Sequence, residues 1–215
     1  MTDTHEAAQA LVTAGKRLVD AGLSPGSSGN ISARAGDDIL LSPTGSALDR
    51  LDPDGLTVLR LDGALIKGPR PSKEYPLHLA FYRRSTQTAA VVHVHSPYAA
   101  AASLLPAWRP HSALPPLTPY FVMRVGQAPL IPYAAPGDAD QARLIERHEM
   151  AFRAVLLQNH GPVTSGRTVE EAVDATIELE EASRLAILTA GQRVNVLTAE
   201  QARSLAEQYG SPWEV

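Results

Sequence analysis

Three histidines in this sequence have the spacing of metal ligands. His93 and His95 are two residues apart in a run of small and β-branched residues, Ala89 to Val94. On a β-strand, residues two apart point to the same face, so both imidazoles can bind one ion from the same side. His160 follows a second apolar run, Val155 to Leu157, and so stands at the mouth of a buried strand, where functional sites gather. These residues predict a metal centre.

The ligand types indicate a catalytic metal rather than a structural one. Three neutral imidazoles leave one position open on a tetrahedral ion, and an open position accepts a substrate oxygen. Glu74, at the start of a predicted helix, can be a fourth ligand, a general base, or each in turn. A carboxylate there also has an ordinary explanation in the helix dipole. Because the chain has no cysteine, only histidine and carboxylate remain; we expect Zn²⁺, with Mn²⁺, Fe²⁺ and Co²⁺ as alternatives.

The other four histidines are left outside the predicted site. His5 lies near the N-terminus and His111 in a proline-rich loop. His78 and His148 lie on predicted helices, and the sequence shows no partner for either. A single histidine is more often hydrogen-bonded within the fold than a ligand.

Three loops have residues that can bind an anion. They are Ser27 to Asn30, Ser42 to Gly45 and Pro71 to Lys73, and each can present backbone N–H groups to a phosphate. Each alone is also an ordinary turn, and none matches a P-loop or a dinucleotide fingerprint. Lys73 precedes Glu74 directly, so a cation beside the metal carboxylate favours an anionic substrate.

The elements that must position these residues alternate along the chain. Apolar periodicity and end signals predict helices and strands that together form a mixed sheet with helices on both faces. Asp62-Gly63, favoured in type I′ turns, predicts a hairpin. The expected helices are Glu6 to Ala21, Glu74 to Arg84, Pro97 to Leu105, Asp138 to Ala151, Thr168 to Thr189 and Thr198 to Tyr209, and the expected strands are Ile31 to Ala33, Asp38 to Leu41, Thr57 to Leu61, Ala64 to Lys67, Ala89 to His95 and Ala154 to Leu157.

Length and charge limit the kind of protein. The chain has 215 residues, and we expect a single domain over residues 1–215. A formal net charge of −4 disfavours nucleic acid and anionic membranes as partners. No apolar run approaches the roughly 20 residues of a membrane span, and the N-terminus lacks the basic flank of a signal peptide, so we expect a cytoplasmic protein.

The motifs, taken in order, resemble the class II aldolase and adducin head-domain family. The order is Gly29-Asn30, Pro43-Thr44-Gly45, Pro71-Ser72-Lys73-Glu74, His93-x-His95 and Asn159-His160-Gly161, which spans nearly the whole chain. The resemblance implies a three-layer α/β/α fold with a central mixed, largely antiparallel sheet. It also implies a homotetramer with active sites at the subunit interfaces.

The resemblance also implies roles for individual residues. Glu74 would be the acid/base and a metal ligand, beside His93, His95 and His160. Tyr120 matches a tyrosine that family aldolases bring from a neighbouring subunit as a proton donor, although on a helix it can equally be a half-buried packing residue. The substrate phosphate would be bound by Gly29, Asn30, Thr44, Gly45, Ser72 and Lys73.

Lys73 bears on the reaction. Fuculose-phosphate-type aldolases have a second serine at this position, whereas Pro-Ser-Lys-Glu, with segments 115–120 and 122–123, is similar to the 3-oxo-tetronate 4-phosphate decarboxylase subgroup. That subgroup implies decarboxylation to dihydroxyacetone phosphate through an enediolate stabilised by the metal. The alternatives are a sugar-phosphate aldolase or epimerase and, ranked lower, a non-catalytic adducin-like module. A cupin-type oxygenase is disfavoured because Glu74 precedes His93 and helices abound.

Overall fold

The computed structural model describes residues 4–214, which form one eight-stranded sheet in the order β4-β3-β2-β1-β5-β8-β7-β6. Every neighbouring pair is antiparallel except β6 and β7, so the predicted mixed, largely antiparallel sheet is confirmed. Residues 1–3 and 215 of the predicted domain lie outside the described residues. The strands are β1 Asn30–Ala35, β2 Asp38–Leu41, β3 Thr57–Arg60, β4 Leu65–Lys67, β5 Ala90–His93, β6 Leu130–Ile131, β7 Ala154–Leu157 and β8 Gly161–Gly166.

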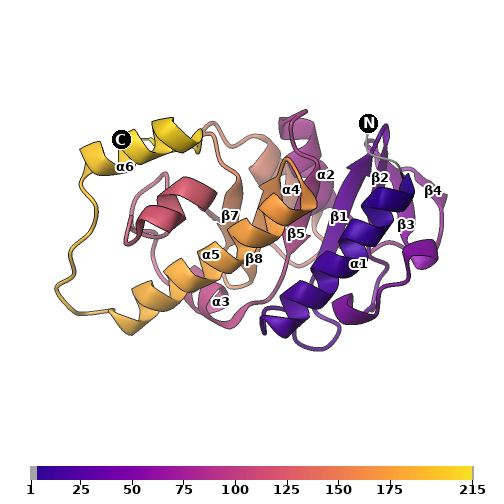
Figure 1. Ribbon diagram of the computed structural model, residues 1–215, viewed down its shortest axis with the longest axis horizontal. Coiled ribbons are helices and arrows are strands. Elements are labelled where there is room, and N and C mark those ends of the chain that lie inside the picture. The colour runs from indigo at the N-terminus through magenta and orange to yellow at the C-terminus, as the bar shows by residue number, and fades with distance from the viewer. Residues whose placement is uncertain (1–3, 215) are drawn as a thin grey trace.

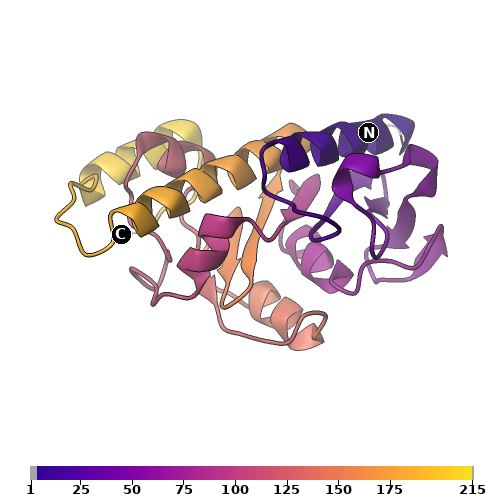
Figure 2. The same ribbon diagram turned by 90° about the horizontal axis from the view of Figure 1, so that it is seen from below.

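Helices cover both faces of the sheet. The helices α1, α3 and α5 pack on one face, and α2 and α4 pack on the other, as Figures 1 and 2 show from two directions. Helix α6 packs on the π-helical turn η3, Phe121–Val125. No helix within residues 4–214 is both long and apolar enough to cross a membrane. The helices are α1 Thr4–Asp20, α2 Tyr75–Arg84, α3 Pro97–Ser103, α4 Ala139–Glu146, α5 Val169–Leu188 and α6 Ala199–Tyr209, with 3-10 turns η1 Leu48–Arg50 and η2 Pro53–Gly55.

Strand β5 shows how side-chain alternation separates the two layers. Val92 and Val94 pack with α1 in one apolar cluster, whereas Val91 packs with α2 in the other. His93 therefore lies on the α2 face of the sheet, on the same side as Val91. The strand ends at His93, two residues before the predicted end, so His95 lies just beyond it.

Helix α4 ends at Glu146, five residues before the predicted end at Ala151. Arg84, the last residue of α2, binds the chain at and beyond this end. Its guanidinium donates hydrogen bonds to the carbonyls of Ile145, His148 and Met150 at 2.6–2.9 Å. A helix that ran to Ala151 would use the Ile145 carbonyl but leave those of His148 and Met150 without a helical donor, so the arginine supplies donors at and beyond the observed helix end and stabilises the irregular path.

The hairpin between β3 and β4 is confirmed, but its turn is not type I′. The Gly63 N–H donates to the Arg60 carbonyl at 2.9 Å, and the Arg60 N–H donates to the Ala64 carbonyl at 2.9 Å. Gly63 has a φ of 95°, and Asp62 is not among the residues with positive φ. This pattern is a three-residue loop, a type I turn closed by a glycine bulge.

Strand β8 was not expected from the sequence, yet it lies in the middle of the sheet between β5 and β7. Its residues Gly161 to Gly166 include glycine, proline and serine, which are typical of turns rather than buried strands. All six are buried. Hydrogen bonding on both edges compensates for the poor strand propensity of this segment.

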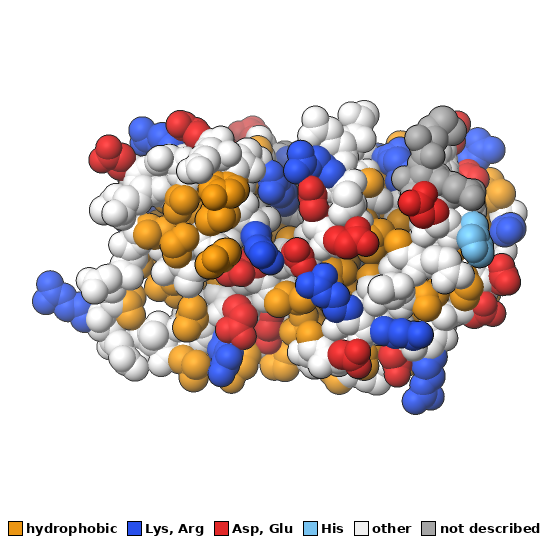
Figure 3. All heavy atoms as spheres, viewed as in Figure 1, with side chains coloured by type: hydrophobic (Ala, Val, Ile, Leu, Met, Phe, Trp, Pro, Cys, Tyr) orange, Lys and Arg blue, Asp and Glu red, His pale blue; other side chains and the backbone are white. Residues whose placement is uncertain are grey.

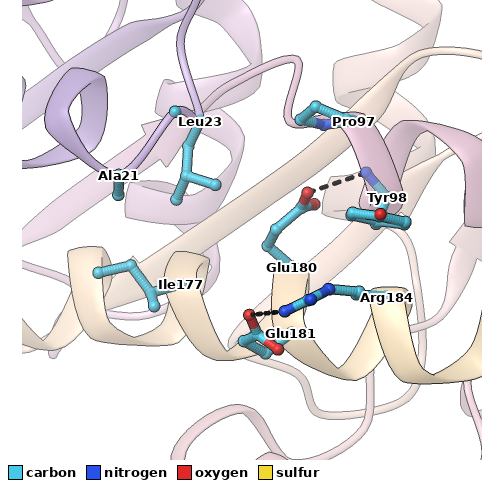
Figure 4. A pocket seen from close by; sticks show the side chains of 9 residues that line it. Ala21, Leu23, Pro97, Tyr98, Ile177, Glu180, Glu181 and Arg184 are labelled. Carbon is cyan, nitrogen blue, oxygen red and sulfur yellow. Dashed lines mark hydrogen bonds and ion pairs between the residues drawn. The ribbon is translucent and has the colours of Figure 1, made fainter.

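Helix α3 is held in place by a buried carboxylate. Glu180 of α5 is 7% exposed and accepts hydrogen bonds from the N–H groups of Tyr98 and Ala99 at 2.9 and 2.7 Å (Figure 4). These N–H groups belong to the first turn of α3 and have no partner within their own helix. Since α3 begins two residues after His95, Glu180 also fixes the chain that leaves the metal-ligand segment.

We predict that Glu180→Ala lowers the free energy of unfolding by about 1–3 kcal/mol, because two buried N–H groups lose their acceptor. Glu181→Ala is the matched control. Glu181 is exposed, forms an ion pair with Arg184 at 3.2 Å, and its loss should change stability by less than about 0.5 kcal/mol. Urea unfolding of the two variants measures the difference. Equal stability of the two variants would show that Glu180 does not hold α3.

Candidate metal centre and active site

The four residues predicted as metal ligands converge in the structure. The His95 Nε2 atom lies 3.2 Å from the His93 Nε2 atom and 3.0 Å from the His160 Nε2 atom. The two oxygens of Glu74 lie 3.6 Å from His93 Nε2 and 3.3 Å from His160 Nε2. One donor atom from each residue lies within 4.8 Å of the others. The sequence positions 74, 93, 95 and 160 thus form a single cluster.

These separations fit one bound cation. Four donors held tetrahedrally at about 2.0–2.1 Å from an ion lie roughly 3.3 Å from one another. The four separations above run from 3.0 to 3.6 Å. Neutral imidazole nitrogens that face one another with their lone pairs repel, and a shared divalent cation removes that repulsion. The cluster is therefore suited to hold a divalent metal.

The backbone of β8 sets the orientation of His93. The His93 Nδ1–H group donates to the Pro162 carbonyl at 2.9 Å, which leaves the Nε2 lone pair free to face the cluster. Gly161 makes this approach possible, since a Cβ atom there would lie 2.6 Å from the Val94 carbonyl oxygen. The unexpected strand therefore orients the His93 imidazole and lies against the backbone of the segment that leads to His95.

His160 is reached through a strained turn. Asn159 has a φ of 59°, which is uncommon for a residue other than glycine. The turn is held by Ser103, whose carbonyl accepts from the Asn159 N–H and whose hydroxyl accepts from the His160 N–H, both at 3.2 Å. His160 Nδ1 is buried, and within residues 4–214 it has no hydrogen-bond partner. The strain and the unpaired nitrogen are features typical of functional sites.

Glu74 is buried and ionised. Burial raises the pKa of this carboxyl, but hydrogen bonds from His160 and Asn30 and the nearness of the His93 and His160 imidazoles outweigh that effect, so the pKa lies well below its usual range. The Asn30 Nδ2 group donates to Glu74 Oε2 at 2.9 Å. An ionised carboxylate is the state that binds a cation.

Three further polar residues behind the cluster were not predicted. His78, Ser32 and Tyr82 are each 0–1% exposed, and they connect to Glu74 through Asn30. The sequence alone shows no partner for His78, because Asn30 and Ser32 lie on a distant strand. The spacing did contain a signal: Glu74, His78 and Tyr82 are four residues apart, which places them on one face of a helix.

The three loops predicted to bind phosphate lie near Glu74, at the ends of the strands and not along an outer strand of the sheet. Gly29 has a φ of 83°, and a Cβ atom there would lie 2.8 Å from the His93 carbonyl oxygen, so this loop passes against the metal-ligand strand. The exposed loop of Thr44 and Gly45 is joined to the third loop, since the Thr44 N–H donates to the Arg70 carbonyl at 3.1 Å. Ser72 accepts from the Glu74 N–H at 3.3 Å.

Asn30 differs from the other predicted phosphate residues. Asn30 is only 3% exposed. The nitrogen of its side-chain amide is hydrogen-bonded to Glu74 and the oxygen to His78. Its side chain is therefore committed to the cluster and not to a phosphate.

The two remaining predicted residues differ in their placement. Lys73 is exposed beside the cluster, and its positive charge is one cause of the lowered pKa of His95, after burial and the charge of His160. Gly137 of the loop before α4 packs against Lys73, since a Cβ there would lie 3.4 Å from the lysine Cβ.

Tyr120 is 56% exposed at the start of η3, where its ring lies 5.7 Å from the Arg124 guanidinium. No hydrogen bond of residues 4–214 joins Tyr120 to the cluster.

Comparison with known proteins identifies the family. Residues 9–187 match the model of the class II aldolase and adducin N-terminal domain. The chain is 39% identical over 206 residues to the 3-oxo-tetronate 4-phosphate decarboxylase of Haemophilus influenzae, covering 95% of this chain and 98% of that one. It is 43% identical over 171 residues to the enzyme of the same name from Cupriavidus necator, covering 80% and 79%. The chain belongs to the class II aldolase and adducin family.

Solved structures agree with this membership. YgbL of Klebsiella pneumoniae, described as an aldolase, epimerase or decarboxylase, superposes with a TM-score of 0.91 at 37% identity, covering 95% of this chain and all of that one. An L-fuculose 1-phosphate aldolase superposes with a TM-score of 0.82 at 26% identity, covering 95% and 96%. The predicted class II aldolase fold is thus confirmed, and the protein is a lyase of this family.

We predict that the metal-free protein loses stability as the pH falls below about 6.5. Burial, more than any other effect, lowers the pKa of His93 to about 4 and that of His78 to about 3, against an ordinary value of 6.5. The unfolded chain therefore binds protons that the native protein does not. Each neutral histidine makes its full contribution to the free energy of unfolding above pH 6.5. That contribution is lost as the pH falls from 6.5 toward the native pKa.

Urea unfolding of chelator-treated protein between pH 7.5 and 4.5 measures this slope, about 1.4 kcal/mol per pH unit for each histidine. Replacing one of the two, as in His93→Gln, should remove about one proton from the slope. A profile that is flat, or that rises as the pH falls, would contradict the buried neutral state of these imidazoles.

Proposed function

We propose that this protein catalyses the metal-dependent decarboxylation of a 3-oxo-tetronate 4-phosphate to dihydroxyacetone phosphate and carbon dioxide. The observation that carries the proposal is the converged cluster of Glu74, His93, His95 and His160 with Lys73 exposed at its edge. Relatives named for this reaction, 38–43% identical over most of their length, support the choice of substrate.

The ion we propose is Zn²⁺, with Mn²⁺, Fe²⁺ and Co²⁺ as alternatives that the same ligands accept. Three imidazoles and a buried carboxylate form its ligand set. A divalent ion held there acts as a Lewis acid toward the carbonyl oxygen of the substrate. The buried surroundings of His93 and Glu74 strengthen that effect, because electrostatic interactions are larger where water is excluded.

The reaction is the cleavage of a β-keto acid. The bond between C1 and C2 breaks, carbon dioxide leaves, and the electron pair forms a double bond between C2 and C3 of an enediolate. C2 then takes up one proton and dihydroxyacetone phosphate results. Since no substrate hydroxyl must lose a proton, a general base is not needed for this cleavage.

Glu74 and Tyr120 have different parts in this proposal. Because Glu74 is ionised, it binds the cation and has no proton to give unless it first receives one. We assign proton donation to C2 to Tyr120 of a neighbouring subunit, which agrees with the exposure of this side chain and its separation from the cluster of its own chain. Lys73 would bind the phosphate or hold the carboxylate until it leaves.

The phosphate itself would lie among the loops beside Glu74. We assign it to Gly29, Asn30, Thr44, Gly45, Ser72 and Lys73, which offer the hydroxyls of Thr44 and Ser72, glycine N–H groups and a cation. The open surroundings of Gly45, where a Cβ would meet no atom within 4 Å, leave room for an anion.

A homotetramer with interfacial active sites is part of the same proposal. Large apolar side chains are exposed near the C-terminal half of α5 and the segment after it. On the face drawn in Figure 3, hydrophobic side chains also gather over η3 beside α6. Such patches are typical of interfaces between subunits. They include Leu185, Leu188, Val194 and Val196, with Leu104, Leu105 and Trp108 from the segment that follows α3. A cytoplasmic location stays a prediction.

An aldolase is the second candidate. Glu74, if it received a proton from the substrate, would serve retro-aldol cleavage with the same metal ligands, and the chain is 32% identical over 173 residues to a 5-deoxy-D-ribulose 1-phosphate aldolase of Bacillus thuringiensis. An epimerase and a non-catalytic adducin-like module rank lower. The intact cluster of four ligands disfavours the non-catalytic module.

We predict that metal-loaded protein converts a 3-oxo-tetronate 4-phosphate to equal amounts of dihydroxyacetone phosphate and carbon dioxide. A coupled dehydrogenase assay and a carbon dioxide electrode measure the two products. Lys73→Ser should bind metal normally but lower the rate, by roughly tenfold or more if a charged hydrogen bond of about 1.5–3 kcal/mol is lost. His95→Ala is the control that should lose both metal and turnover.

The products separate the candidates. Glycolaldehyde or lactaldehyde formed from another sugar phosphate, with no carbon dioxide from the oxo acid, would establish the aldolase instead. Undiminished decarboxylation by Lys73→Ser would remove Lys73 from the mechanism, and activity in metal-free protein would contradict the metal requirement.

A further inference from the structure

A chain of buried polar side chains runs from Glu74 into the layer between the sheet and α2. Asn30 Nδ2 lies 2.9 Å from Glu74 Oε2, and Asn30 Oδ1 lies 2.5 Å from His78 Nε2. The other His78 nitrogen, Nδ1, lies 2.7 Å from Ser32 Oγ, and Ser32 Oγ lies 2.8 Å from the Tyr82 hydroxyl. None of the four residues behind Glu74 is more than 3% exposed.

The chemistry of the groups fixes the direction of every hydrogen bond. An ionised carboxylate accepts only, so the Asn30 amide must present its NH₂ group to Glu74 and its oxygen to His78. That oxygen accepts only, so His78 carries its proton on Nε2. With burial lowering its pKa to about 3, His78 is neutral, and its Nδ1 accepts from Ser32, which in turn accepts from Tyr82.

We propose that His78 is a positioning residue of the metal centre, which acts through Asn30 to hold Glu74 in place. Deleting the Nε2–H donor leaves the Asn30 oxygen buried without a partner. The amide is then free to turn, and its oxygen can face the carboxylate and repel it. Glu74 Oε2 would lose its fixed position, and with it the placement of Oε1, which lies 3.3 Å from His160 Nε2.

The arrangement resembles the outer partners that orient metal ligands in other proteins. His78 lies one helical turn after Glu74 on α2, whereas Asn30 and Ser32 lie two apart on β1. Glu74, His78 and Tyr82 therefore share one face of α2, and Asn30 and Ser32 share one face of β1. The packing of α2 on the sheet brings the two sets into hydrogen-bond contact. In this arrangement the Asn30 side chain binds the Glu74 carboxylate and not the substrate.

The test compares the metal affinity and kcat of three variants with those of the wild-type protein, and the inference rests on the proposed metal centre. His78→Phe keeps the ring volume but removes both nitrogens, and we expect roughly 10–100-fold weaker metal binding and lower kcat, with KM nearly unchanged. His78→Gln keeps an N–H group for the Asn30 oxygen, and we expect it to recover most of that loss.

Thr176→Val is the matched control. The Thr176 hydroxyl is buried and hydrogen-bonded to Thr164 at 2.6 Å, on the α5 face of the sheet away from Glu74. We expect this variant to lower the melting temperature and to leave metal affinity and kcat unchanged. A His78→Phe variant that folds and matches the wild-type protein in both quantities would overturn the proposal.

A second measurement decides the question should His78→Phe fail to fold. Nitrogen chemical shifts of the wild-type protein labelled with ¹⁵N-histidine report which ring nitrogen carries the proton, and the spectrum of His78→Gln identifies the His78 signal. We expect the Nε2–H form, in the presence and in the absence of Zn²⁺. The Nδ1–H form would overturn the proposal. Neither the chemical shifts nor the metal affinity, which is measured by titration with Zn²⁺ alone, depends on which substrate the enzyme uses. A failure of this proposal can therefore be told apart from a failure of the proposed function.

Discussion

The structure depends on bringing three imidazole nitrogens and one carboxylate within a few ångströms of one another where there is little water. Taking a carboxylate out of water costs several kcal/mol, and imidazoles placed lone pair to lone pair repel. In the native protein both costs are offset by neighbours: Asn30 donates to Glu74, and the Pro162 carbonyl fixes the proton of His93. A divalent cation completes the compensation, so the fold and the metal chemistry are coupled.

This constraint explains several residues that would otherwise be unfavourable where they stand. Gly29 and Gly161 allow backbone to approach the end of β5 more closely than a Cβ atom permits. Asn159 accepts a positive φ that brings His160 round to the cluster. Glu180 removes the cost of a buried helix start directly after His95. Each feature is local, but all of them lie near the end of β5 or the start of its neighbour β8, where the histidines cluster.

That Glu74, His93, His95 and His160 cluster could be predicted from the sequence, whereas the residues that support them could not. Same-face geometry at two-residue spacing is a property of any strand, so His93 and His95 could be paired without knowing the fold. Strand β8 was missed because Gly161, Pro162 and Ser165 favour turns, and only pairing on both edges makes them a strand. His78 was missed for a related reason: its partners Asn30 and Ser32 come from a strand more than forty residues earlier, and packing alone brings them together.

The central claim is that Glu74, His93, His95 and His160 form one metal centre. A crystal structure of the protein loaded with Zn²⁺, with anomalous data collected at the zinc edge, tests it most directly. The account predicts one ion per chain at about 2.0–2.1 Å from the Nε2 atoms of all three histidines. A fully loaded crystal with its ion elsewhere, or with fewer than three of these imidazoles bound to it, would contradict the account.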